Sequence, residues 1–150
     1  MKSDVFGIAS DHAGYALKSS LVDFLQSSGV SIQDYGPVEP TRCDYPDFAH
    51  TVCTAIQQGE VQAGILVCGT GIGMSMTANK HTGIRAAVVS DVFSARATKQ
   101  HNNANILCLG ERVVGQGLAQ EIVMAWLEAT FEGGRHQSRI DKMMAWEQNR

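Results

Sequence analysis

A cysteine followed by a glycine-rich turn is the feature of this sequence that points most directly to chemistry. Residues 63–80 read AGILVCGTGIGMSMTANK, in which an apolar run ends at Cys68 and glycines follow at positions 69, 71 and 73. This pattern predicts a buried strand, a tight loop and the start of a helix. Backbone N–H groups in such a loop stabilise negative charge next to them. Because the thiolate is the reactive form of cysteine, Cys68 is a candidate catalytic group.

The same residues allow two other interpretations. Cysteines commonly end buried strands, and Cys53 and Cys108 lie in apolar patterns that are typical of a core. The loop could instead bind a dinucleotide, with Asp91, 20 residues after Gly71, as the acid that contacts the ribose. However, the spacing is G-x-G-x-G rather than G-x-G-x-x-G, and the loop follows the third predicted strand rather than the first. Catalysis is therefore favoured over a non-catalytic nucleotide-binding or regulatory module.

Two further polar pairs lie at the ends of predicted elements. Asp11 and His12 come directly after the first apolar run, where Asp11 could equally cap the helix that follows. His101 and Asn102 end a predicted helix, where both residue types also occur for structural reasons. Neither pair identifies a site without the rest of the sequence.

The elements that position these residues alternate between strand and helix. Strands are predicted at Val5–Ser10, Val30–Gln33, Ala63–Cys68, Arg85–Ser90 and Asn105–Leu109. Apolar residues at helical spacing predict helices over 17–25, 48–56, from the glycine loop onward, over 95–101 and over 117–130. The three prolines predict a loop over Tyr35–Asp47. This order predicts a three-layer α/β/α, Rossmann-like fold with a five-stranded parallel sheet, whose ligands bind beyond the carboxyl ends of the strands.

The segment from about residue 131 has the pattern of a C-terminal arm. Gly133 and Gly134 interrupt the chain, and a last helix with a polar start and an apolar end should follow. Arg135 and Arg139 share a face if that helix forms, and no acidic residue lies between them, which favours a phosphate partner over an ion pair. We expect residues 1–150 to form one domain whose arm packs on itself or on a neighbour.

Composition excludes several classes of function. The chain has 150 residues, 44% of them hydrophobic, and a net charge of −3, with no basic run that would predict nucleic-acid binding. No apolar stretch is long enough to span a membrane, and the start lacks a signal-peptide pattern. The four cysteines show neither a C-x-x-C pair nor zinc spacing, so we expect free thiols, no metal and a cytoplasmic protein.

Six segments together resemble the ribose-5-phosphate isomerase B family, which also contains the galactose-6-phosphate isomerase subunits. They are SDHAGYALK, DYPDFA, GILVCGTGIGMSMTANK, RAAVVSD, QHNNANILCLGERVVG and EGGRHQSRI, in the family's order over essentially the whole chain. The resemblance implies an aldose–ketose isomerase that interconverts ribose 5-phosphate and ribulose 5-phosphate through a cis-enediolate, without a cofactor. It also implies a homodimer, or a tetramer, with shared active sites. Family members differ in substrate length, so four- or six-carbon aldose phosphates (erythrose 4-phosphate, allose or galactose 6-phosphate) remain alternatives.

The resemblance also implies a role for each matching residue. Cys68 matches the general base, and the segment 74–77, where some relatives carry a glutamate base, has no carboxylate here. Thr70 and His101 match the pair that opens the furanose ring. The amides of Gly69, Thr70, Gly71, Ile72 and Gly73 match the anion hole for the enediolate. The remaining matches are to substrate contacts: Asp11, His12 and Asn102 at the sugar or the phosphate, Tyr45 near the sugar, and Arg112, Arg135 and Arg139 at the phosphate, some of them from the second subunit. A catalytically silent subunit would not need Cys68, Thr70 and His101.

Overall fold

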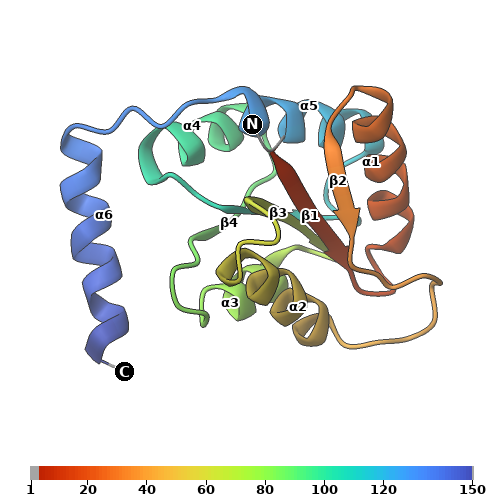
Figure 1. Cartoon of the computed structure of the whole chain (residues 1–150). Coiled ribbons are helices and arrows are strands. Elements are labelled where there is room, and N and C mark those ends of the chain that lie inside the picture. Colours follow the sequence, from red (N-terminus) through yellow and green to blue (C-terminus); the bar gives the residue numbers. More distant parts are fainter. Residues whose placement is uncertain (1–3, 150) are drawn as a thin grey trace.

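A five-stranded parallel sheet forms the centre of the protein in a computed structural model that describes residues 4–149 (Figure 1). The strands are β1 (Val5–Ser10), β2 (Ser31–Asp34), β3 (Ala63–Cys68), β4 (Ala86–Val88) and β5 (Ile106–Gly110). Their order across the sheet is β2-β1-β3-β5-β4, and every pair is parallel. The central strand β3 places Val67 opposite Ser10 of β1 and Cys68 opposite Gly110 of β5. The carboxyl ends of β1, β3 and β5 therefore meet at one edge.

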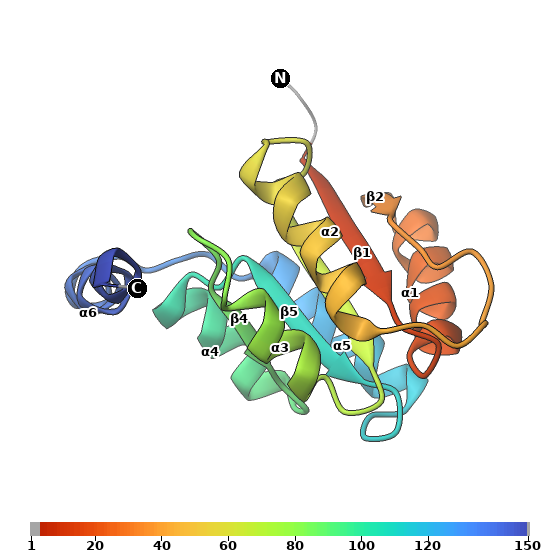
Figure 2. The same ribbon diagram turned by 90° about the horizontal axis from the view of Figure 1, so that it is seen from below.

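Helices cover both faces of this sheet, which confirms the expected α/β/α layers. The helices are α1 (Tyr15–Ser27), α2 (Tyr45–Gln57), α3 (Ile72–Ala78), α4 (Val92–Asn102), α5 (Gln116–Glu128) and α6 (Arg135–Ala145), followed by the 3-10 turn η1 (Trp146–Asn149). Helices α1, α4 and α5 pack on one face and α2 and α3 on the other (Figures 1 and 2). No helix within residues 4–149 is long and apolar enough to cross a membrane.

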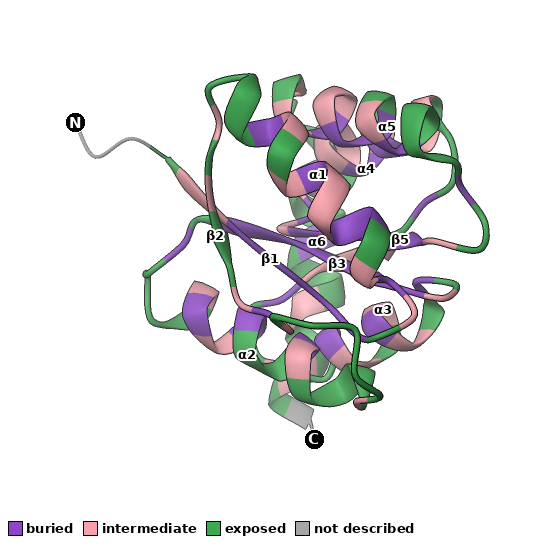
Figure 3. Cartoon of the chain, turned by 90° about the vertical axis from the view of Figure 1, so that its right-hand side faces the viewer, coloured by how far each residue is buried: buried purple, intermediate pink, exposed green. Residues whose placement is uncertain are grey.

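The core consists of two apolar layers separated by the sheet. Successive side chains of a strand point to opposite faces. Ile65 and Val67 therefore pack with the layer under α1 and α5, whereas Leu66 and Cys68 pack with the layer under α2 and α3. The central strands are buried along their length, as Figure 3 shows. Burial on both faces explains the continuous apolar run that precedes the glycine loop.

Two predicted boundaries were wrong. The loop predicted over Tyr35–Asp47 ends earlier, because α2 begins at Tyr45 with Pro46 in its first turn. Proline is tolerated there, since the first amides of a helix have no partner within it. The fourth strand is also shorter than Arg85–Ser90, because Asp91 leaves the sheet to cap α4, accepting the Ser94 N–H at 2.7 Å.

The last helix stands apart from the sheet as an arm (Figure 1). Gly133 and Gly134 adopt positive φ values of 66° and 56°, conformations that favour glycine, and they turn the chain into α6. The far end of the arm returns to the body, where the Glu147 carboxylate accepts the Gly83 N–H at 3.0 Å. The helix predicted after the double glycine is confirmed.

Candidate active site

Cys68 lies at the carboxyl end of β3, and its sulfur already accepts a hydrogen bond from the glycine loop. The Gly71 N–H donates to Cys68 Sγ at 3.1 Å, and the Ile72 N–H donates to Thr70 Oγ1 at 3.2 Å. Cys68 is only 4% exposed. The loop therefore holds a backbone donor against the sulfur at the position that sequence analysis selected.

Glycine is required at position 71 for two reasons. Its φ is +80°, in the left-handed region, and a Cβ atom there would lie 2.9 Å from the carbonyl carbon of Leu109 and 3.0 Å from Val88 Cγ2. The loop consequently packs directly on the ends of β5 and β4. This packing fixes the direction of the Gly71 N–H toward Cys68.

The segment after β1 lies beside this loop. The Asp11 N–H donates to the Val67 carbonyl at 3.2 Å, and the Asp11 carboxylate accepts the Gly14 N–H at 3.0 Å. Asp11 therefore shapes the turn before α1 but does not cap the helix, whose N-cap residue is Gly14. The ring of His12 has Nδ1 3.0 Å from the carbonyl oxygen of Cys43 and 3.2 Å from its nitrogen. His12 thus joins the carboxyl edge to the segment that leads into α2.

The turn after β5 completes this edge. The Arg112 N–H donates to the Gly69 carbonyl at 3.0 Å, and its side chain lies over Gly69, where a Cβ atom would be 3.6 Å from Arg112 Nη1. Glu111 binds the same region, because its N–H donates to the Cys68 carbonyl at 2.9 Å and its carboxylate accepts the Leu17 N–H at 2.6 Å. Sequence analysis missed Glu111, since nothing in E-R-V-V-G indicates a helix that begins almost a hundred residues earlier.

Tyr45 reaches the glycine loop from the start of α2. A Cβ atom on Gly73 would lie 2.6 Å from the Tyr45 ring, so the ring rests against the backbone of α3. The structure thus brings ten candidate residues together at the carboxyl edge: Asp11, His12, Tyr45, Cys68, Gly69, Thr70, Gly71, Ile72, Gly73 and Arg112. A thiol, a row of amides and a guanidinium at one place can move a proton and bind an anion.

The other four candidates lie elsewhere in the chain. His101 and Asn102 end α4, which runs back from the carboxyl edge to the amino edge of the sheet. There the Asn102 carbonyl accepts from Arg85 Nε at 3.0 Å, just before β4 begins. Arg135 and Arg139 lie on the arm beyond. Within one chain, therefore, the structure does not bring His101 to Thr70, nor the arm arginines to Arg112.

This second group is organised around an acid that sequence analysis overlooked. No acid lies between Arg135 and Arg139, but Glu132 lies just before them. Glu132 Oε1 is 3.6 Å from Nε2 of His101 and 3.6 Å from Nε2 of His136, and the two imidazole rings stack with centroids 4.5 Å apart. No helical spacing signals this contact, because Glu132 precedes α6 and the turn at Gly133 and Gly134 brings it to His136.

The guanidinium groups of both regions have no charged partner. Within residues 4–149, the side chains of Arg112, Arg135 and Arg139 form no ion pair or hydrogen bond. Glu132 engages the two histidines instead of the arginines. All three guanidiniums are therefore without a charged partner in this part of the chain, and phosphate binding by them stays a prediction.

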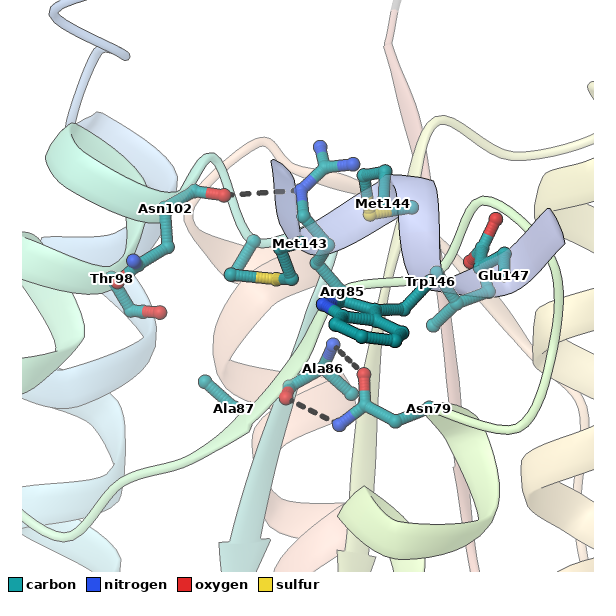
Figure 4. Close-up of a pocket in the computed structure, with 12 residues that line it drawn as sticks. Asn79, Arg85, Ala86, Ala87, Thr98, Asn102, Met143, Met144, Trp146 and Glu147 are labelled. Atoms are coloured by element: carbon teal, nitrogen blue, oxygen red, sulfur yellow. Dashed lines mark hydrogen bonds between the residues drawn. The ribbon is translucent and has the colours of Figure 1, made fainter. Parts of the chain in front are cut away.

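A cavity of about 320 Å³ lies away from Cys68, between the arm and the edge of the sheet (Figure 4). Met143, Met144 and Trp146 of the arm line it together with Arg85 and Ala86 at the start of β4. Asn102 is the one candidate site residue in its lining. The lining is mostly apolar and contains no cysteine or histidine, so this cavity lies where the arm packs against the body and is not a candidate catalytic site.

The two other buried thiols and Asp91 have structural explanations. Burial raises the pKa of Cys53 to about 12, and burial also raises the pKa of Cys108 well above its ordinary value. Both pack in the core, as predicted. Asp91 caps α4, and the Ser94 amide that it accepts from lowers its pKa. The acid that the dinucleotide interpretation requires is thus accounted for by local structure.

Comparison with known proteins assigns the chain to a family. Residues 6–143 match the model of the Ribose/Galactose Isomerase family. The chain is 49% identical over 150 residues to ribose-5-phosphate isomerase B of Escherichia coli, covering 100% of this chain and 99% of the relative. It is 46% identical over 142 residues to D-erythrulose-4-phosphate isomerase of Pectobacterium atrosepticum, covering 93% of each. The solved structure of ribose-5-phosphate isomerase B from Mycoplasma genitalium with bound ribulose-5-phosphate matches with a TM-score of 0.94 at 41% identity, over 100% of both chains. This protein therefore belongs to the ribose/galactose isomerase family and is, by type, an aldose–ketose isomerase.

Proposed function

We propose that this protein interconverts ribose 5-phosphate and ribulose 5-phosphate, with Cys68 as the general base. The observation that carries the proposal is the hydrogen bond from the Gly71 N–H to Cys68 Sγ, at the edge where Arg112 and Tyr45 also converge. The relatives named for ribose 5-phosphate, one of them solved with ribulose-5-phosphate, support this substrate. We propose that residues 1–150 act as one isomerase domain with an arm from about residue 131.

The proposed chemistry is a proton transfer between neighbouring carbons. Cys68 removes the proton from C2 of the open aldose, and the electron pair moves through C1 onto the carbonyl oxygen, which gives a cis-enediolate. A proton then passes from the C2 hydroxyl to the C1 oxygen, and C1 takes the proton held by Cys68 as C2=O forms. This gives the ketose, with nothing gained or lost overall. A fixed amide aimed at the developing oxyanion contributes about 3–4 kcal/mol in such reactions. The loop amides from Gly69 to Gly73 are the donors proposed for this charge.

We further propose that each active site is shared by two subunits. His101, Asn102 and the arm arginines lie at the opposite edge of the sheet from Cys68, so one chain holds two separate halves. In a homodimer, the second half of one subunit would complete the first half of its partner. Exposed apolar side chains near the edge strand, including Val88, Phe93 and Trp146, support such an interface.

The proposed roles of the second half are ring opening and phosphate binding. His101, with Thr70 of the other subunit, would assist the opening of the furanose ring that precedes proton transfer. The unpaired guanidiniums of Arg135 and Arg139 would bind the phosphate together with Arg112. Asp11, His12, Tyr45 and Asn102 would contact the sugar. Binding the phosphate far from C1 and C2 orients the reacting carbons, because binding energy from a remote group can be used in the transition state.

A four-carbon substrate is the second candidate. The relative named for D-erythrulose-4-phosphate is 46% identical, almost as similar as the relative named for ribose 5-phosphate. A panel of aldose phosphates from four to six carbons, assayed for ketose formation, decides between them through the ratio of kcat/KM.

The role of Cys68 is tested by comparing two buried cysteines. Cys68→Ala should lower kcat by about 100-fold or more, the usual effect of losing a general base. Cys53→Ala, which removes a thiol from the same core layer, should retain activity. Calorimetric binding of ribose 5-phosphate to the Cys68→Ala protein should stay within a few-fold. Substantial turnover by a folded Cys68→Ala protein would reject the proposed base.

A further inference from the structure

Glu132 holds the start of the arm against the end of α4. Its backbone N–H donates to the Gln100 carbonyl at 3.0 Å, which fixes the linker beside the last turn of α4. Its carboxylate then lies at ion-pair distance, 3.6 Å, from both His101 and His136. The arm and the helix that carries His101 are thus joined through one side chain.

The surroundings of the two histidines differ. The side chain of His136 is 10% exposed and that of His101 is 44% exposed. Burial, followed by the charges of His101 and Arg135, lowers the pKa of His136, with Arg139 acting in the same direction and Glu132 opposing it. The lowered pKa favours the uncharged form of the His136 ring, which stacks on His101. The more exposed His101 ring lies at the same 3.6 Å distance from the Glu132 carboxylate.

We propose that Glu132 and His136 are positioning residues for His101 in the opening of the sugar ring, an inference that rests on the proposed function. In that step a proton leaves the anomeric hydroxyl, the bond between C1 and the ring oxygen breaks as C1=O forms, and the ring oxygen gains a proton. His101 exchanges one of these protons with the sugar. The Glu132 carboxylate stabilises the imidazolium that appears, and the stacked His136 ring fixes the plane of His101. Proton transfer between C1 and C2 does not require either residue.

The same three side chains are of types that bind metal ions, and their ligand atoms lie within 4.8 Å of one another. Their geometry favours the positioning role. The two rings are stacked with planes only 14° apart, so one ion cannot lie in both ring planes unless a ring turns. Both ring nitrogens lie 3.6 Å from one carboxylate oxygen, Glu132 Oε1, which is ion-pair distance. The experiment that follows therefore includes a result that would reveal a metal site at this cluster.

The test compares a reaction that needs ring opening with two that do not. Glu132→Gln should lower kcat for ribose 5-phosphate about tenfold, while KM changes less than about twofold. This loss is smaller than the loss expected when the acid–base residue itself is removed. Turnover of erythrose 4-phosphate, which cannot form the furanose, should stay within about twofold, as should solvent deuterium exchange at C1 of ribulose 5-phosphate, followed by NMR. Glu128→Gln, an exposed acid at the end of α5, is the matched control and should behave as the parent protein.

The outcomes separate this inference from the function on which it rests. If His101→Ala impairs ribose 5-phosphate selectively but Glu132→Gln leaves all activities unchanged, the positioning role is wrong while the proposed function stands. If His101→Ala itself affects all substrates equally, the ring-opening role of His101 fails. An equal loss of ribose 5-phosphate turnover and deuterium exchange in Glu132→Gln would show a purely structural role. Activity that depends on Glu132 and is lost on chelation, then restored by Zn²⁺, would replace the proposal with a metal site.

Discussion

The Leu17 N–H donates to the Glu111 carboxylate at 2.6 Å and joins positions that are 94 residues apart in the sequence. Leu17 lies in the first turn of α1, whose own N-cap residue, Gly14, offers no side chain. Glu111 therefore caps α1 from another part of the chain. Its backbone N–H also donates to the Cys68 carbonyl at 2.9 Å. One residue connects the helix after Asp11 to the strand end that carries the thiol.

The first prediction concerns this cap. Glu111→Ala should lower the free energy of unfolding by about 1 kcal/mol, because it leaves a helix N-terminal amide without its acceptor. Glu111→Gln, which keeps an oxygen acceptor, should lose less. Urea unfolding measures both, and Glu121→Ala, an exposed acid of α5, serves as the control. Equal stability of the Glu111→Ala and Glu121→Ala proteins would contradict the capping role.

The second prediction concerns the contact of Tyr45 with Gly73. Gly73→Ala should raise KM for the sugar phosphate, because its new Cβ atom would lie 2.6 Å from the Tyr45 ring and displace it. In a Tyr45→Ala background the same substitution should change KM much less, so a double-mutant cycle gives a clear coupling. Gly117→Ala, where a Cβ atom meets nothing within 4 Å, should leave KM unchanged. Additive effects of Gly73→Ala and Tyr45→Ala on KM would show that Gly73→Ala does not act through the Tyr45 ring.

The third prediction concerns stability at alkaline pH. Burial raises the pKa of Cys53 from 9.0 to about 12, so the folded protein holds this proton more tightly than the unfolded chain. The resulting stabilisation is present below pH 9 and is lost as the pH rises from 9 toward 12. The free energy of unfolding should therefore fall above pH 9 less steeply in Cys53→Ala than in the parent protein. Cys43→Ala, at a half-buried position, should keep the parent slope. Identical slopes of the free energy of unfolding against pH in all three proteins would show that Cys53 does not cause the loss of stability.

Local sequence patterns predicted most elements because each depends on neighbours in the chain. The apolar run that ends at Cys68 and the glycine at 71 depend on burial and on a single backbone angle, and both were found as expected. The start of α2 was missed because Pro46 was interpreted as a breaker, although proline suits a first helical turn. Strand order was not predictable, since the pairing of β3 with both β1 and β5 depends on contacts between distant segments.

The order of strands and helices in the sequence already implies that the candidate residues form two separate groups. Sequence analysis did not make this prediction. A helix that leads from one parallel strand to the next must end at the amino edge of the sheet, so His101 could not meet Cys68 within one chain. Glu111 was not predictable, because its partner Leu17 is brought to it only by the fold. Glu132 was not predicted, because its contacts with His101 and His136 form only where the fold brings the arm beside the end of α4.

The fourth prediction concerns the phosphate contacts of the arm. Arg139→Ala should raise KM for the sugar phosphate roughly tenfold or more, because a charge-assisted hydrogen bond contributes about 1.5–3 kcal/mol. Inorganic phosphate should inhibit the parent protein competitively and the Arg139→Ala protein more weakly. Lys142→Ala removes a charge from the same exposed helix and is the control for a general effect of net charge. Equal changes in KM for Arg139→Ala and Lys142→Ala would assign the effect to charge alone.

The fifth prediction tests whether the two halves come from different subunits. Cys68 and Arg139 lie on opposite sides of one chain, so a shared site must combine Cys68 of one subunit with Arg139 of another. Cys68→Ala and Arg139→Ala proteins, each impaired alone, should regain activity when mixed at low substrate concentration, because one site of each hybrid dimer then carries both groups. Native mass spectrometry establishes that hybrids form, and each variant mixed with itself is the control. Hybrids that form without recovering activity would show that the arm serves the site of its own subunit.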